Sequence, residues 1–476
     1  MPPSLLIVGS GPSGLAAAYE AVNHDAGVTV VERLDRVGGL CRTLEFGGAR
    51  FDIGPHRFFT KNADVADLFH RMLGDDAVRV RRRTRILHGR AFFDYPLTPL
   101  NAIAGVGLLS GARIGGSYAA ARLNRLVAPR PPETFEDWIV GNFGRQLFET
   151  FFKVYTEKVW GVSCRQIGAE WASQRIKGLS LGAAVRNAVF GAGKARIKTL
   201  VDEFSYPRLG AGQPYEKMSD TIVRDGGRVI TGSRVRTLRR EGSAVRAAII
   251  EDESGLCSEI EADYFLTSST LSDTLAMLDP PPPQDVLEAA TALRYRDHLG
   301  VNLIATGPTF PDNWIYVHSP DVELARVSNY RNFSAEMMGG ADVSPITAEY
   351  FSFPGDHLSR MSDVDLIDKA VKELRKVGLL CHEKILDAFV VRSEKAYPVI
   401  EIGYERHIAV IRGWLGGLTN LLPIGRSGMF KYNNQDHAIA TGTLATRRAL
   451  GIGWTDPWTV NIDAEYHEST RDPAAA

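Results

Sequence analysis

The first thirty residues combine two short apolar runs with one helical pattern. Residues 5–8 (L-L-I-V) are all apolar, which is typical of a strand buried in a parallel sheet, and residues 28–31 (V-T-V-V) form a second run. Residues 15–21 between them are rich in alanine, the strongest helix former. The pattern predicts a strand, a helix and a second, parallel strand, and therefore an α/β fold.

The turn between the first strand and the helix reads G-S-G-P-S-G over residues 9–14. Between a strand and a helix, this G-x-G-x-x-G pattern indicates dinucleotide binding. Gly9 permits the tight turn, Gly11 lets backbone N–H groups reach a pyrophosphate, and Gly14 lets the helix pack closely on the strand. The helix N-terminus, which begins with Pro12 and Ser13, adds N–H donors and a positive dipole for the phosphates.

The residues after the second strand indicate which dinucleotide is bound. Glu32 ends that strand, where a carboxylate accepts hydrogen bonds from ribose hydroxyls and disfavours the 2′-phosphate of NADP. Gly38 and Gly39 would let a loop lie flat against the cofactor, and Arg42 could add a charge to the diphosphate. This E-x-x-x-x-x-G-G segment resembles the second signature of FAD-binding oxidoreductases of the amine-oxidase type, which implies non-covalent FAD. The same resemblance assigns cofactor contacts to Arg33, to Leu40 and, through its backbone, to Val235, for which an ordinary hairpin residue is the alternative.

Four further segments are similar to UDP-galactopyranose mutases. They are residues 51–60 (F-D-I-G-P-H-R-F-F-T), 155–161 (Y-T-E-K-V-W-G), 397–398 (Y-P) and 425–434 (G-R-S-G-M-F-K-Y-N-N). The first two also resemble protoporphyrinogen-oxidase-like proteins. The chain is therefore identified as a mutase-like member of the flavin amine-oxidase superfamily. The resemblance implies a discontinuous Rossmann-type FAD-binding domain with a helical insert and a mixed-sheet substrate domain.

The resemblance also implies roles for individual residues. The positions that it places at the flavin are Gly54, Pro55, His56, Gly425, Arg426 and Asn434. The candidate catalytic residues are His56, Arg296, Arg426, Tyr397 and Tyr432, with Arg296 neutralising a substrate diphosphate. The candidate substrate-binding residues are Tyr155, Trp160, Arg175, Tyr397 and Tyr432, with Tyr155 stacking on uracil. Core packing for the aromatic residues and a surface or ion-pairing role for the two arginines Arg296 and Arg426 stay open, and Glu157 and Lys158 are expected on a solvated or paired face.

The departures from the mutase pattern concern the substrate. The mutases carry an R-I-P-V-R run, whereas Arg175 is followed by I-K-G-L, so the second arginine is lost. A hydrogen bond to a charged group is worth about 1.5–3 kcal/mol, so this loss weakens diphosphate binding. Phe59 stands in place of a histidine, and Asn434 in place of an aspartate. We therefore expect a mutase-like enzyme for a nucleotide-linked or lipid-linked sugar, with a flavin oxidoreductase that takes a hydride from a small molecule as the alternative.

The chain length and a run of prolines suggest how the domains follow one another. A chain of 476 residues exceeds one simple core at ~100–200 residues per domain. Residues 280–283 are four prolines, which suggest a stiff connector. We expect an FAD-binding domain over 1–95, 208–278 and 401–455, a helical substrate domain over 96–207, a mixed-sheet substrate domain over 279–400, and a C-terminal tail over 456–476.

The composition of the chain limits the classes of ligand and partner that it is expected to bind. The chain has 55 Lys and Arg against 56 Asp and Glu, which argues against a nucleic-acid ligand. Its four cysteines are scattered without a C-x-x-C pair, so we expect neither a metal site nor a disulfide framework. No secretory signal or transmembrane span is predicted, the uncharged stretch 97–112 is expected to be a buried or surface helix, and the cytoplasm is the expected compartment. A homodimer and NAD(P)H as an external reductant stay open.

Overall fold

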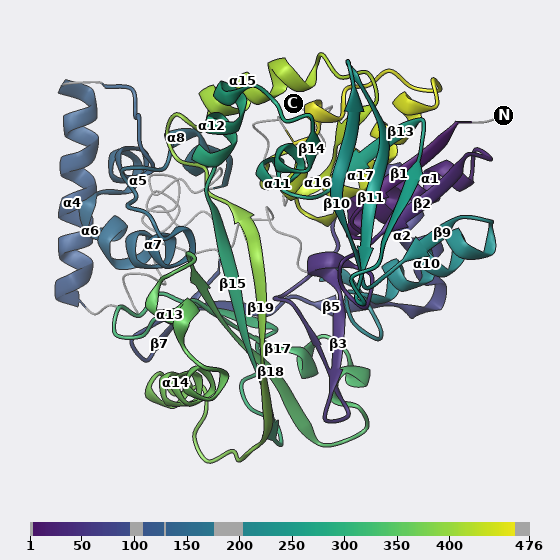
Figure 1. Ribbon diagram of the computed structural model, residues 1–476. Helices are drawn as coiled ribbons and strands as arrows, with labels where there is room; N and C mark the ends of the chain where they lie inside the picture. The colour runs from purple at the N-terminus through teal and green to yellow at the C-terminus, as the bar shows by residue number, and fades with distance from the viewer. Residues whose placement is uncertain (1–2, 96–107, 128–129, 176–202, 462–476) are drawn as a thin grey trace.

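The computed structural model describes residues 3–95, 108–127, 130–175 and 203–461 (Figure 1). A parallel sheet with its helices lies at the upper right of Figure 1, a group of helices at the left, and long strands run downward below both. This arrangement confirms the predicted fold class, a Rossmann-type domain with a helical insert and a mixed sheet.

The Rossmann-type domain is built on a five-stranded parallel sheet in the order β20-β13-β1-β2-β9. Its strands are β1 (Ser4–Val8), β2 (Gly27–Val31), β9 (Arg228–Ile230), β13 (Tyr264–Thr267) and β20 (Leu421–Pro423). The helices packed on one face are α1 (Pro12–Val22), α2 (Ala63–Leu73), α10 (Gln213–Arg224) and α17 (Gln435–Ala449). Because these strands come from three distant parts of the chain, the sheet is discontinuous in sequence, as expected.

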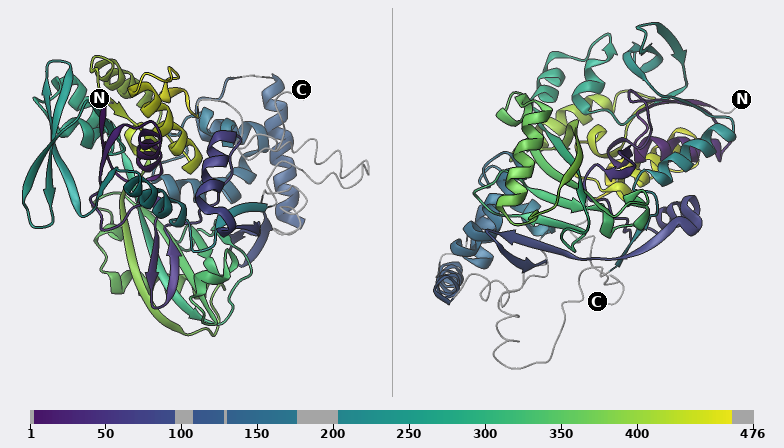
Figure 2. Two further views of the ribbon diagram at one scale, coloured as in Figure 1. Left: turned by 90° about the vertical axis from the view of Figure 1, so that its right-hand side faces the viewer. Right: turned by 90° about the horizontal axis from the view of Figure 1, so that it is seen from below.

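The other face of the parallel sheet packs against a second layer. Leu6, Val8 and Phe265 share a core with residues of a four-stranded sheet in the order β12-β11-β10-β14. Its strands are β10 (Ser233–Glu241), β11 (Ala244–Asp252), β12 (Cys257–Glu261) and β14 (Leu278–Asp279). The helices in the same layer are α11 (Leu271–Ala276), α12 (Gln284–Ala292) and α15 (Tyr404–Leu415). Figure 2 shows this layer and helix α4 at opposite edges of the molecule.

A mixed sheet of seven strands lies below, in the order β19-β15-β18-β17-β16-β6-β7. Its strands are β6 (Thr84–His88), β7 (Ala91–Asp94), β15 (Tyr295–Thr306), β16 (Trp314–Val317), β17 (Arg326–Asn329), β18 (Val343–Ser352) and β19 (Ile385–Pro398). Helix α14 (Asp363–Lys376) covers one face, where Leu366, Ala370 and Leu374 pack on Val301 and Leu303. Polar residues of β15, β17 and β18 lie on the opposite face.

One predicted boundary needs correction. The sequence predicts residues 84–94 in the FAD-binding domain, but β6 pairs in parallel with β16, and β7 pairs with β6. The buried side chain of Leu87 belongs to the core of the seven-stranded sheet, which explains why this hairpin lies there. The other domain boundaries stay predictions.

The helical insert contains α4 (Leu108–Val127), α5 (Phe135–Phe143), α6 (Arg145–Leu147), a π-helix over Phe148–Lys153, α7 (Val154–Trp160) and α8 (Ala169–Arg175). The remaining elements are short: strand pairs β3 (Thr43–Phe46) with β4 (Ala49–Asp52) and β5 (Ala77–Arg81) with β8 (Glu203–Pro207), and helices α13 (His357–Arg360) and α16 (Gly425–Gly428). Within the described ranges, no helix is long and apolar enough to cross a bilayer.

Helix α17 approaches α1 closely enough to require a glycine. A Cβ on Gly442 would collide with the carbonyl oxygen of Ser13. We predict that Gly442→Ala lowers the free energy of unfolding by about 1–3 kcal/mol, because backbone atoms cannot move aside without cost. Gly413→Ala is the matched control, since Gly413 is an exposed helical residue and a Cβ there would have no atom within 4 Å. It should be neutral or stabilising by up to ~1 kcal/mol in thermal or denaturant unfolding. Equal effects of the two substitutions would contradict the prediction.

Candidate cofactor and substrate site

One glycine of the glycine-rich turn is required neither by its backbone conformation nor by the packing of the protein around it. Gly9 has φ +95°, and a Cβ on Gly14 would collide with the carbonyl oxygen of Gly9, so the fold needs both. Gly11 has an ordinary φ of −69°, and the nearest atom to a Cβ there would be Gly39 Cα at 3.9 Å. Because a side chain at Gly11 would meet little protein, its absence leaves room for a ligand. The turn therefore fits the phosphates of a dinucleotide.

Glu32 is buried at the end of β2 and is tied to this turn. Its Oε2 accepts hydrogen bonds from the backbone N and the Oγ of Ser10, both at 2.8 Å, and its Oε1 accepts one from Leu34 N at 3.0 Å. These bonds hold an acceptor beside the glycine turn. The predicted ribose contact of Glu32 fits this position and stays a prediction.

The loop with adjacent glycines lies on the same turn. Gly38 has φ +102° and donates to the carbonyl oxygen of Ser10 at 2.9 Å. Arg42 Nη1 donates to Gly39 O at 2.7 Å. Burial lowers the pKa of Arg42, and the nearby Glu32 opposes that shift. Arg33, in contrast, is largely exposed and forms an ion pair with Glu394 at 3.8 Å.

Helix α16 completes the cradle from the far end of the chain. Gly425 has φ +78°, and a Cβ there would collide with Ser13 Oγ. Arg426 Nε donates to Asn433 O at 2.8 Å, and Asn434 caps α17. The last segment of the chain is thereby brought to the N-terminus of α1, where the predicted cofactor residues from both ends meet. Val235 is also buried, in β10.

His56 connects two loops of the site. Its Nε2 lies 2.9 Å from both Leu40 O and Ile53 O and therefore donates to them, while its Nδ1 lies 3.8 Å from Cys41 Sγ. Burial first, and then the charge of Arg426, lower the pKa of His56 to about 4. A neutral ring whose Nε2 proton is already shared favours a positioning role over proton transfer. Pro55 precedes this histidine, and the catalytic role of His56 stays a prediction.

A buried charge cluster that the sequence did not reveal lies beside Gly54. Arg326 Nε and Nη2 donate to the two oxygens of Glu349 at 2.8 and 2.6 Å, and His298 Nε2 lies 2.9 Å from Glu349 Oε2. Burial alone would raise the pKa of Glu349, but Arg326 and His298 hold it at about 2. A Cβ on Gly54 would lie 3.1 Å from Glu349 and 3.2 Å from Arg326, so the cofactor loop touches this cluster. Single charged residues inside apolar strands were the signal that could have found it, because buried charges are paired.

The predicted aromatic residues meet in one region. The Tyr397 and Tyr432 rings lie 5.8 Å apart, and the guanidinium of Arg426 lies 5.0 and 5.2 Å from their centroids. The Trp160 ring lies 5.7 Å from Tyr432. Tyr155 lies five residues before Trp160 in α7 and stacks on His318 at 4.7 Å.

Arg296 occupies a different position from the one expected of a diphosphate ligand. It is 4% exposed and donates to Phe351 O at 2.7 Å, to Lys158 O at 3.2 Å and to Asp356 at 3.3 Å. Burial lowers the pKa of Arg296 to about 10, against the opposing effect of Asp356. These bonds engage the guanidinium at the end of α7, where Gly161 leaves room for it. These contacts favour a structural role, and the predicted diphosphate contact of Arg296 stays a prediction.

Lys158 is paired rather than solvated, and its partners are backbone carbonyl groups. Its Nζ donates to the carbonyl oxygens of Val317, Ser319 and Leu324 at 3.2, 2.7 and 3.0 Å. Glu157 Oε1 accepts from Cys164 N at 3.3 Å, which makes it paired, as expected. The prediction for the Arg175 side chain and for residues 176–179 lies outside the described residues.

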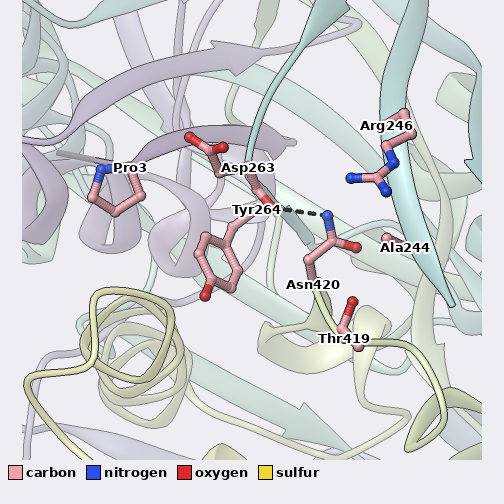
Figure 3. Close-up of a pocket in the computed structure, with 7 residues that line it drawn as sticks. All are labelled: Pro3, Ala244, Arg246, Asp263, Tyr264, Thr419 and Asn420. Carbon is pink, nitrogen blue, oxygen red and sulfur yellow. Dashed lines mark hydrogen bonds between the residues drawn. The ribbon is translucent and has the colours of Figure 1, made fainter. Parts of the chain in front are cut away.

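A surface cavity of about 430 Å³ lies away from this region (Figure 3). It is lined by Pro3, Ala244, Arg246, Asp263, Tyr264, Thr419 and Asn420. These residues include the amino ends of β13 and β20, whereas ligands of parallel sheets bind at the carboxyl ends. Asn420 Nδ2 already donates to Asp263 O at 2.8 Å. The cavity is therefore not the candidate site. In the described part of the chain, no group of three or more His, Cys, Asp or Glu could hold a metal ion.

Comparison with known proteins defines the class. Residues 12–392 match the flavin containing amine oxidoreductase family, and the chain belongs to that family. It is thus a flavin-dependent enzyme, and the open turn at Gly11 and the buried Glu32 fit such a cofactor.

Similar individual proteins include coproporphyrinogen III oxidases and a probable UDP-galactopyranose mutase. A coproporphyrinogen III oxidase of Mycobacterium tuberculosis H37Rv is 27% identical over 430 residues, which cover 87% of this chain and 91% of the relative. A probable UDP-galactopyranose mutase of Klebsiella pneumoniae is 25% identical over 173 residues, 35% of this chain and 43% of the relative. Among solved structures, a reduced UDP-galactopyranose mutase has TM-score 0.83 at 20% identity and covers 97% of this chain and 98% of its own. A putative protoporphyrinogen oxidase from Exiguobacterium sp. 255-15 has TM-score 0.70 at 17% identity, with 94% and 98% covered. At these identities, the structures establish the fold alone.

Substitution of Gly11 tests whether the space beside this residue holds the cofactor. We predict that Gly11→Val abolishes flavin retention while the protein without flavin melts within about 2 °C of the flavin-free wild type, because few protein atoms surround the new side chain. Gly14→Val is the contrasting variant, since it should destabilise the fold itself. Flavin absorbance after gel filtration and circular dichroism melting separate the two effects. Full flavin content in Gly11→Val would contradict the phosphate role of the turn.

Proposed function

We propose that the chain is an FAD-dependent, mutase-like enzyme that interconverts the ring forms of a nucleotide-linked sugar. A lipid-linked sugar is the alternative substrate for the same reaction. One observation carries the proposal: the guanidinium of Arg426 lies over the Tyr397 and Tyr432 rings, and the charge of Arg326 acts on both Tyr155 and Tyr397. Aromatic faces for a base and cations for a diphosphate are what such a substrate needs. The similarity in fold to a reduced UDP-galactopyranose mutase supports the same interpretation.

The base would bind at Tyr155. One face of this ring already stacks on His318, with the planes 12° apart, and Tyr316 meets it edge-on at 5.4 Å. The residue is only partly buried, so ring surface remains for a ligand. Stacking of a base on an aromatic side chain is worth about 1–3 kcal/mol.

The diphosphate would bind between the two tyrosines and the two arginines. Burial raises the pKa of Tyr397, so its hydroxyl stays protonated and can donate a hydrogen bond. Glu349 uses Nε and Nη2 of Arg326, which leaves Nη1 for a ligand. Arg426 uses Nε for Asn433 O and keeps its two terminal nitrogens. These donors would stabilise the negative charge that develops on a departing diphosphate.

The reduced flavin, when bound, supplies an electron pair to the anomeric carbon and is regained at the end, so that the reaction has no net redox change. The residues of this chain then bind the base, hold the diphosphate within reach after it has left, and keep water from the activated sugar. Buried aromatic side chains around Tyr432, such as Trp160, suit this last task.

A flavin oxidoreductase is the second candidate, because coproporphyrinogen III oxidases align over 87% of the chain. For that reaction the flavin, held in the same cradle, would supply a hydride acceptor. Arg326 and Arg426 would then bind carboxylates of the substrate, since guanidinium pairs with carboxylate as well as with phosphate.

We predict that the protein reduced with dithionite converts UDP-galactose or a related nucleotide sugar to its ring-contracted isomer. The flavin should still be reduced when the reaction ends, because no net electrons are transferred. Chromatography of the nucleotide sugars and the flavin absorbance measure the two quantities, and the oxidised protein is the control. Anaerobic bleaching of the oxidised flavin by coproporphyrinogen III, without any ring contraction, would favour the oxidoreductase instead.

We predict that Tyr155→Ala weakens nucleotide binding about 5- to 150-fold, the equivalent of about 1–3 kcal/mol of lost stacking. Tyr155→Phe keeps the ring and should bind within about threefold of the wild type. Calorimetric titration with the free nucleoside diphosphate measures the affinity, and flavin content monitors the fold. Wild-type affinity in Tyr155→Ala would assign this tyrosine to core packing.

A further inference from the structure

Helix α4 presents an apolar side to solvent at the edge of the molecule. This 20-residue helix is the outermost element at the left of Figure 1. Leu109, Leu123, Leu126 and Val127 are 83%, 63%, 81% and 76% exposed. Single exposed apolar residues are normal, but a contiguous apolar patch marks an interaction surface, and here four such residues recur along one helix.

The exposed apolar residues share one face. At 100° per residue, they fall within an arc of about 120° that contains no polar side chain. The outward face consists of Leu109, Ala112, Gly116, Ala119, Ala120, Leu123, Leu126 and Val127, all exposed. The opposite face holds the helix on the insert: Ile114 is buried, and Ser117 Oγ accepts from Gln146 N at 3.1 Å. The outward face is thus not needed for the fold of α4.

Arginines border this face, and the helix has no acidic residue. Arg113 lies along one edge of the arc and Arg122 along the other, and both are exposed. Arg125 lies further round and donates to Asn142 Oδ1 at 2.9 Å. An apolar stripe flanked by arginines is typical of helices that lie in the plane of a membrane interface.

We propose that the outward face of α4 docks the protein on the surface of a bilayer rich in anionic phospholipid. The apolar side chains would enter the boundary between head groups and acyl chains, while Arg113 and Arg122 would meet lipid phosphates at the same depth. A second copy of the chain fits less well, because an α4–α4 contact would bring arginines together without acidic partners from that helix. The proposal is independent of the proposed function.

The test uses the full chain with its flavin and two kinds of vesicle. With vesicles of phosphatidylcholine containing about 30% phosphatidylglycerol, the protein should co-sediment, and with pure phosphatidylcholine its binding should be at least about tenfold weaker. The double variant Leu123→Glu with Leu126→Glu should lose binding by more than about tenfold. Arg113→Ala with Arg122→Ala should weaken binding about 25-fold, since each arginine near an anionic surface contributes about fivefold.

Leu256→Glu is the matched control, because Leu256 is 69% exposed and lies between β11 and β12. These strands belong to the layer at the opposite edge of the molecule from α4 (Figure 2). Leu256→Glu should bind vesicles as the wild type does. All variants should keep flavin content and melting temperature, since every substituted side chain is already exposed. Failure of the wild type to sediment with anionic vesicles at low salt would overturn the proposal, as would unchanged binding of the double glutamate variant. A dimer that this variant disperses, without vesicle binding by the wild type, would assign the face to a second copy.

Discussion

The close approach of backbone segments at the N-terminus of α1 is the constraint on which the rest of the structure depends. Gly442 and Gly425 allow α17 and α16 to touch Ser13, and a Cβ on Gly39 would come within 2.9 Å of the Cα of Gly11. None of Gly442, Gly425 and Gly39 tolerates a side chain, because overpacking a tight contact costs about 1–3 kcal/mol. Segments from both ends of the chain thereby form one cradle. Of the 46 glycines, those at this junction have a defined purpose.

The parallel sheet and the glycine turn could be predicted because their signals are local. Apolar runs, helix formers and turn glycines lie within a few residues of one another, and each element depends mainly on its own neighbours. Arg296 shows the opposite case. Its acceptors come from Lys158, Phe351 and Asp356, so no local pattern distinguishes this clamp from a ligand-binding arginine. The pairing of β6 with β16, across more than two hundred residues, was missed for the same reason.

The net charge of the candidate site depends on which of its two arginines, Arg326 or Arg426, is paired with a carboxylate. Glu349 neutralises Arg326 and is itself almost inaccessible, so this pair contributes directed N–H donors with little net charge. Among the described residues, no carboxylate forms an ion pair with Arg426, which instead lies over two tyrosine rings. Arg426 therefore keeps its positive charge next to the cradle. An anionic ligand would be attracted there although the chain as a whole is nearly neutral.

The bonds made by Lys158 have a consequence for the cost of binding. Its ammonium group joins α7 to carbonyl groups on both sides of His318, the residue on which Tyr155 stacks. Helix α7, the segment around His318 and the stacked rings of Tyr155 and His318 are therefore held together before any ligand binds. A ligand that binds to a preorganised surface does not lose affinity to the ordering of side chains, which otherwise costs about 0.5–1.5 kcal/mol for each side chain immobilised. In the proposed function, Lys158 would thus act on recognition through entropy that was already lost when the protein folded.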